Sequence, residues 1–170
     1  FAINQWFAAN QQPPSLKAII PWEGFADIYR DALYHGGILC IFMTNWFTAH
    51  LIHHTLGRAS QIHPDTWQKN TLHFWLNNNL DSGAFSGSQA QWDKITVPFL
   101  SVGNWTGFGL HLRGNILGYE ELTSPKKLVV TGARNTFEAH HMFDQIEFHE
   151  KECLPFYDRY LKGIDNGFMD

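Results

Sequence analysis

The sequence has only two cysteines, and they match no known motif. Cys40 and Cys153 lie far apart in the chain and fit no spacing of metal ligands or redox dithiols. A single disulfide and two free buried thiols both stay open, and two free thiols are the favoured interpretation. The cysteines therefore point to neither a metal site nor a redox site.

Positive charge is also scarce. The chain has 12 Lys and Arg against 16 Asp and Glu, and it contains no run of basic residues. Nucleic acids and anionic membranes bind clustered basic side chains, so neither is an expected partner. No apolar stretch reaches the roughly 18 residues of a membrane span, and no signal-peptide pattern is visible. We therefore expect a cytoplasmic protein.

The residues that are abundant are apolar. Hydrophobic residues make up 44% of the chain and charged residues 16%, which favours a packed core over disorder. A chain of 170 residues is long enough for one domain. It starts at Phe1 rather than at an initiator Met and stops at Asp170, just past a turn. We interpret it as an internal piece of a longer protein.

Strand and helix patterns alternate along most of the chain. Short apolar runs closed by Pro or Gly predict buried strands at 16–21, 97–103 and 127–131. Helical periodicity predicts helices at 1–10, 110–122 and 140–161. Strands that alternate with helices are typical of a parallel sheet, so the fold class is α/β.

One segment differs from this alternation. Residues 27–92 show helical patterns, at 27–34, 39–56 and 64–76, and no credible strand. We expect a helical insertion between two strands of the sheet, which leaves 1–26 and 93–170 as the sheet-containing segments.

Polar residues follow each predicted strand. The three loops are Trp22-Glu-Gly, residues 103–107, and residues 132–135 running on to His140 and His141. Ligands of parallel sheets gather at the carboxyl ends of the strands. Three such loops on consecutive strands indicate a functional site there.

Several sequence blocks resemble one family. The blocks are Pro-Trp-Glu-Gly-Phe at 21–25, Val-Pro-Phe-Leu-Ser-Val-Gly-Asn-Trp-Thr-Gly at 97–107, Leu-His-Leu-Arg-Gly-Asn at 110–115, and Phe-Tyr-Asp-Arg-Tyr-Leu-Lys-Gly at 156–163. They look like successive blocks of the CocE/NonD type of α/β-hydrolase, which includes X-prolyl dipeptidyl-peptidases and cocaine esterase. The resemblance spans nearly the whole chain.

The resemblance implies a fold and an activity. The fold would be the C-terminal part of an α/β-hydrolase parallel sheet, with residues 27–92 as a helical cap. A nucleophilic serine, in a Gly-x-Ser-Tyr motif, would lie about two residues upstream of Phe1, and a jelly-roll domain would follow Asp170. Such a serine hydrolase cleaves an ester or amide through an acyl-enzyme. The substrate would be a small ester, an amide or a short peptide, with no metal or organic cofactor, and this piece alone would be inactive.

The acid of the triad does not stand where the resemblance places it. Many relatives carry it two residues after the Trp of the post-strand loop, which is Gly107 here. Glu23, just past the preceding strand, is the proposed replacement. Asp27 is the alternative, although it is better placed to cap the following helix.

The base is also displaced. Counting forward from the last strand reaches Asn135, which cannot accept a proton. Counting backward from the end of the long helix reaches His140, the proposed general base, with His141 as the runner-up.

Four further residues are expected to bind substrate, namely Trp22, Tyr29, Asn104 and Trp105. Arg30 and Arg113 are interpreted as structural.

A histidine cluster has the helical spacing that zinc sites use, at His50, His53 and His54. Leu51 replaces the Glu of the zinc-protease motif, so no metal site is predicted. A catalytically inactive binding module on the same scaffold stays open as the alternative, because Gly107 and Asn135 stand at catalytic positions.

Overall fold

The computed structural model describes residues 2–46, 71–134, 138 and 142–169. It forms two compact units. We call the first, Phe1–Asp27 with Gln89–Asp170, the sheet unit, and the second, Ile28–Ser88, the insert unit. Among the described residues, no helix combines the length and apolar character needed to cross a bilayer.

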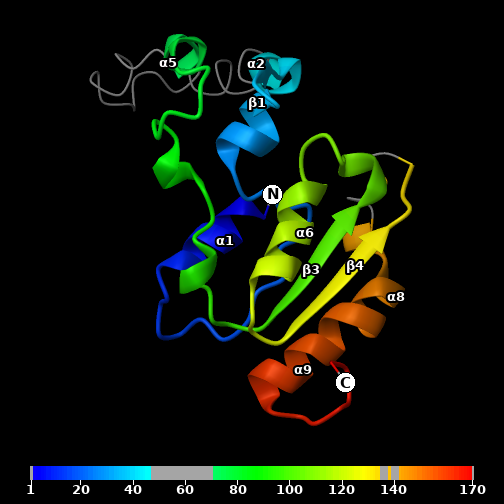
Figure 1. Ribbon diagram of the computed structural model, residues 1–170. Helices are drawn as coiled ribbons and strands as arrows, with labels where there is room; N and C mark the ends of the chain where they lie inside the picture. The colour runs from blue at the N-terminus through cyan, green and yellow to red at the C-terminus, as the bar shows by residue number, and fades with distance from the viewer. Residues whose placement is uncertain (1, 47–70, 135–137, 139–141, 170) are drawn as a thin grey trace, which may run out of the picture. The chain divides into compact units, whose positions relative to one another are not determined.

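Two parallel strands form the centre of the sheet unit. Strand β3 (Phe99–Asn104) pairs in parallel with β4 (Lys126–Thr131), and Figure 1 shows them side by side. The predicted strand at 16–21 lies along the other edge of β3, where Ile19 and Trp22 form parallel bridges to it. Pro21 has no N–H to donate, which explains why this segment pairs at isolated bridges rather than as a continuous strand. The predicted α/β arrangement with a parallel sheet is confirmed.

Helices of the sheet unit cover both faces of β3. They are α1 (Ile3–Asn10), α6 (Leu112–Glu121), α8 (Ile146–Phe148) and α9 (Leu154–Lys162), with short 3₁₀ turns at Trp92–Lys94, Trp105–Gly107 and Met142–Asp144. Because successive strand residues point to opposite faces, Phe99 packs with Trp6 on one side. Leu100 and Val102 pack with Phe156 on the other.

The helix predicted at 140–161 is not one regular helix. A π-helical segment, His149–Cys153, separates α8 from α9. The predicted end is confirmed, because Gly163 adopts φ 71° and Ile164 N–H donates to the Asp158 carbonyl at 3.0 Å. His140 and His141 lie outside the described residues.

The insert unit contains a hairpin, so the prediction of no strand there was wrong. It consists of a π-helical turn at Ile28–Leu33, strands β1 (Tyr34–His35) and β2 (Ile38–Leu39), helices α2 (Ile41–Trp46) and α5 (Thr71–Asn77), and a 3₁₀ turn at Ser86–Ser88. The strands pair antiparallel across Gly36 and Gly37, whose φ values of 59° and 84° suit a two-residue turn. The rest of the two predicted helices at 39–56 and 64–76 falls within 47–70, outside the described residues.

Both cysteines are free thiols, and Cys153 is buried in the sheet unit. Burial, with a smaller contribution from the charge of Glu152, raises the pKa of Cys153 to about 11 from 9.0. Since the thiolate is the reactive form, this pKa lowers its fraction near pH 8 roughly 100-fold. We expect maleimide to label Cys153 in the native protein at least about 100-fold more slowly than in denaturant. Peptide mass spectrometry would measure both rates, and equal rates would contradict the prediction. A Cys40→Ser variant, in which Cys153 is the one remaining cysteine, is the control that the measured label lies on Cys153.

Candidate active site

Glu23 occupies a strained and fully buried position at the end of the extended segment that pairs with β3. Its φ is 52°, a left-handed conformation that costs a non-glycine residue on the order of 1 kcal/mol or more. Its side chain is buried, and its N–H donates to the Val102 carbonyl at 2.8 Å. Strain of this kind persists only where the surroundings fix it, and it concentrates at functional sites.

A buried asparagine fixes the turn that carries Glu23. The Asn115 side chain on α6 donates to the Pro21 carbonyl at 2.7 Å and accepts from the Gly24 N–H at 3.1 Å. Trp6 Nε1 donates to the Gly24 carbonyl at 3.1 Å. The backbone on both sides of Glu23 is therefore held by side chains from two helices of the sheet unit.

The Glu23 carboxylate contacts a histidine that the sequence did not single out. Glu23 Oε2 lies 2.6 Å from Nδ1 of His111, and both side chains are buried. The Phe25 ring stacks on the imidazole, with 6.0 Å between ring centroids and 10° between ring planes. Glu23 Oε1 is also buried, and it has no hydrogen-bond partner within the described part of the chain. One carboxylate oxygen thus holds an imidazole, while the other has no hydrogen-bond partner among the described residues.

The space next to this carboxylate explains the glycine at 107. A Cβ on Gly107 would lie 3.0 Å from Glu23 Oε2, closer than most real Cβ contacts. Gly107 therefore leaves the room that the Glu23 carboxylate fills. The resemblance places a carboxylate on residue 107. Such a side chain would occupy the space beside the Glu23 carboxylate, so the two groups would overlap.

Asn104 lies at the carboxyl end of β3 and is fully buried. Its amide donates to Thr106 Oγ1 at 2.5 Å, and this hydroxyl donates to the Ala133 carbonyl at 3.2 Å. These contacts join the loop after β3 to the loop after β4. Asn104 is thus placed at the predicted edge of the sheet, where its amide organises two loops.

The remaining predicted substrate-binding residues lie in different settings. Trp22 is buried and packs on Phe148, with 4.6 Å between ring centroids. Trp105 is 62% exposed. Tyr29 belongs to the insert unit, where its hydroxyl donates to the Asn79 carbonyl at 2.9 Å. Of the predicted site residues, the structure brings Glu23 and Asn104 to the same edge of the sheet.

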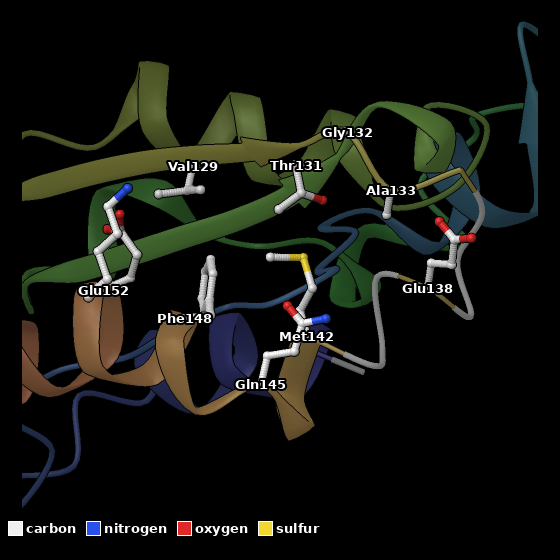
Figure 2. Close-up of a pocket in the computed structure, with 10 residues that line it drawn as sticks. Val129, Thr131, Gly132, Ala133, Glu138, Met142, Gln145, Phe148 and Glu152 are labelled. Atoms are coloured by element: carbon white, nitrogen blue, oxygen red, sulfur yellow. The ribbon is translucent and has the colours of Figure 1, made fainter.

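A cavity of about 530 Å³ lies beside the carboxyl end of β4 (Figure 2). Its lining combines apolar and polar side chains, and its volume is within the range of small-molecule pockets. The residues that line it are Val129, Thr131, Gly132, Ala133, Glu138, Met142, Gln145, Phe148, Lys151 and Glu152. Figure 2 shows Met142 and Phe148 opposite the strand residues Val129 and Thr131.

The sequence also singled out two arginines, Arg30 and Arg113, and the histidine cluster at positions 50, 53 and 54. Arg30 forms an ion pair with Asp81 at 2.6 Å within the insert unit. Arg113 lines a separate cavity of about 260 Å³ on α6. Across the described ranges, no group of three or more His, Cys, Asp or Glu side chains could hold a metal ion, and His50, His53 and His54 lie outside those ranges.

Comparison with known proteins identifies the family. The model of the X-Pro dipeptidyl-peptidase (S15) family matches residues 1–134. The chain belongs to this family. It is also similar to two crystal structures of a CocE/NonD family hydrolase from Staphylococcus aureus, each 30% identical, with TM-scores of 0.79 and 0.74. No curated protein matches the chain.

The predicted resemblance to CocE/NonD-type hydrolases is therefore confirmed. The two solved structures match 98% of this chain, whereas the chain spans only 28% of their length. The chain thus corresponds to one part of these larger structures.

Proposed function

We propose that the S15-family protein containing this chain is a serine hydrolase that cleaves an ester or amide through an acyl-enzyme. The observation that carries the proposal is the buried Glu23 carboxylate, held in a strained turn at the carboxyl edge of a parallel sheet. Its Oε2 is bonded to His111, and its Oε1 has no hydrogen-bond partner among the described residues. A carboxylate oxygen that can orient the imidazole of a general base is what serine hydrolases use to activate their nucleophile.

In the proposed reaction, the nucleophile is a serine about two residues upstream of Phe1. Its Oγ attacks the substrate carbonyl carbon while His140 takes the serine proton. The tetrahedral intermediate collapses, and the leaving group departs with the proton from the imidazolium. Water then attacks the acyl-enzyme, with the same imidazole first accepting and then returning a proton to serine. Backbone N–H groups and a tyrosine next to the serine would stabilise the oxyanion.

The start of α1 supports this placement of the nucleophile. A Cβ added to Gly24 would lie 3.0 Å from the Ala2 Cβ, so the chain reaches α1 directly beside the turn that carries Glu23. Since an extended chain advances about 3.5 Å per residue, a serine a few positions before Ala2 is within reach of this turn.

The proposed substrate is a small ester, an amide or a short peptide. The cap predicted at residues 27–92, which contains the insert unit, would carry aromatic side chains that restrict what enters the site. The proposed chemistry requires no metal and no organic cofactor, because the serine, imidazole and carboxylate supply the nucleophile and the proton transfers.

A fluorophosphonate probe tests the proposal on the full-length protein. The activated serine should react with the probe, and peptide mapping should place the label on a serine just upstream of Phe1. The unlabelled protein should hydrolyse a fluorogenic acyl ester, and labelling should abolish that turnover. Heat-denatured protein, in which the serine is no longer activated, is the control.

The alternative proposal is an inactive binding module on the hydrolase scaffold. Asn135, which stands where a family histidine is expected, is the residue that favours it. The module predicts neither labelling nor turnover of esters, amides and X-Pro peptides, and that result would reject the hydrolase.

A further inference from the structure

The strongest unassigned feature is the buried contact between Glu23 and His111. We propose that His111 is a positioning residue, whose Nδ1–H fixes one oxygen of the Glu23 carboxylate so that the other is available to the imidazole of the general base. The inference rests on the proposed function and adds to it a residue that holds the acid in place.

The two carboxylate oxygens of Glu23 have different environments. Oε2 lies 2.6 Å from His111 Nδ1, a short distance that is typical of a charge-assisted hydrogen bond. Oε1 is buried without a hydrogen-bond partner among the residues that the structure describes. A buried carboxylate oxygen without a partner is costly, so a donor to Oε1 is expected. An imidazole N–H of the general base would provide that donor.

His111 is itself held rigidly, as a positioning residue must be. Only 7% of the surface of His111 is exposed, and the Phe25 ring stacks on the imidazole. Its backbone N–H donates to the Gly107 carbonyl at 2.9 Å. The 107–111 turn therefore provides both the open space beside Glu23 Oε2 and the donor that fills its hydrogen bond.

The atom that makes the contact gives the inference a specific test. Nδ1 is attached directly to Cγ of the imidazole ring, as the amide nitrogen of Asn is attached to its Cγ. Asn at position 111 can therefore place an N–H donor close to the Nδ1 position. In Gln the amide nitrogen is one carbon further from the backbone, near the Nε2 position, where it no longer meets Glu23. Asn has no base that could carry a proton in the reaction.

The experiment measures kcat and KM of the full-length protein and its variants with a fluorogenic ester. We expect His111→Ala to lower kcat roughly 10–100-fold, by analogy with the loss when a partner that orients a metal-ligating side chain is removed, with KM within about 2-fold. His111→Asn should restore most of the lost kcat, whereas His111→Gln should stay as low as His111→Ala. Glu121→Gln, at the exposed end of α6 and outside the predicted cap, is the control and should leave both constants unchanged.

Each outcome decides a different question. If kcat of His111→Ala equals that of the wild type, His111 positions nothing and the inference is wrong. If His111→Asn folds but is as inactive as His111→Ala, the site needs the imidazole itself, and His111 would be a proton carrier. If His111→Ala does not fold, the kcat values of His111→Asn and His111→Gln still test the inference, which predicts the higher value for His111→Asn. Wild-type protein that neither turns over ester nor reacts with fluorophosphonate would reject the proposed function, and the inference with it.

Discussion

Replacement of Glu23 by Gln is expected to lower kcat/KM of the full-length protein by on the order of 10³-fold or more. The amide has nearly the shape of the carboxylate, so the strained turn and its hydrogen bonds should survive. It lacks the negative charge that stabilises an imidazolium, and it can present an N–H where the carboxylate presents an acceptor. Steady-state hydrolysis of a fluorogenic ester measures the loss, which should fall mainly on kcat.

Glu121→Gln is the matched control, because it makes the same replacement of a carboxylate by an amide away from the site. Glu121 is an exposed glutamate at the end of α6. Its activity should equal that of the wild type. Wild-type turnover by Glu23→Gln would remove Glu23 from the mechanism.

A second variant separates the position of the acid from its charge. Glu23→Gly relieves the left-handed backbone and empties the space beside Gly107. Adding Gly107→Asp would place a carboxylate where the family resemblance expects it, and the double variant should recover part of the activity that Glu23→Gly loses. No recovery would show that the two positions are not interchangeable.

The strands and α6 of the sheet unit could be predicted from the sequence because local patterns determine them. The strand predicted at 97–103 is β3 at Phe99–Asn104, and the helix predicted at 110–122 is α6 at Leu112–Glu121. Apolar runs bounded by Pro or Gly are consistent over several residues, so they outweigh errors at single positions. The hairpin at Tyr34–Leu39 was missed because each of its strands has only two residues, too few for a period-2 pattern.

The candidate site was harder to predict because its central contact is not local. Glu23 was proposed as a site residue from its place after a strand, which is a local signal. His111 lies 88 residues further along the chain, and no spacing rule connects the two. The sequence carried one signal for His111, namely that Gly107 lacks the acid that the family resemblance places there. A carboxylate supplied from elsewhere would need a hydrogen-bond donor near the same loop.

The largest stability effect is expected from Gly114→Ala on α6. A Cβ at this position would overlap the Gly24 carbonyl oxygen and would lie 2.5 Å from the Ala26 nitrogen. Both atoms belong to the backbone, so no side-chain rotation can relieve the overlap, and α6 must move away from the turn. Overpacking of this kind typically costs about 1–3 kcal/mol, and a contact this close to backbone should lie at or above the top of that range. The gain of about 1 kcal/mol from placing Ala in a helix offsets only part of it.

Denaturant unfolding of the full-length protein, followed by tryptophan fluorescence, measures the free-energy change of Gly114→Ala. Gly109→Ala is the control, because no heavy atom of the described residues beyond its chain neighbours lies within 4 Å of its Cβ position. Its effect should be within about 0.5 kcal/mol of zero. Equal stability of the two variants would contradict the close approach of α6 to the turn.

The same substitution also tests how the turn positions Glu23. When α6 moves back, the hydrogen bond of 3.1 Å from the Gly24 N–H to the Asn115 side chain lengthens first, because Asn115 is the next residue of the helix. That bond helps hold Glu23 in its strained conformation. Gly114→Ala protein that is still folded should therefore lose hydrolase activity at temperatures well below its unfolding transition, whereas Gly109→Ala should not. Activity and fluorescence recorded over the same temperature range would show whether the turn loosens before the sheet unit unfolds.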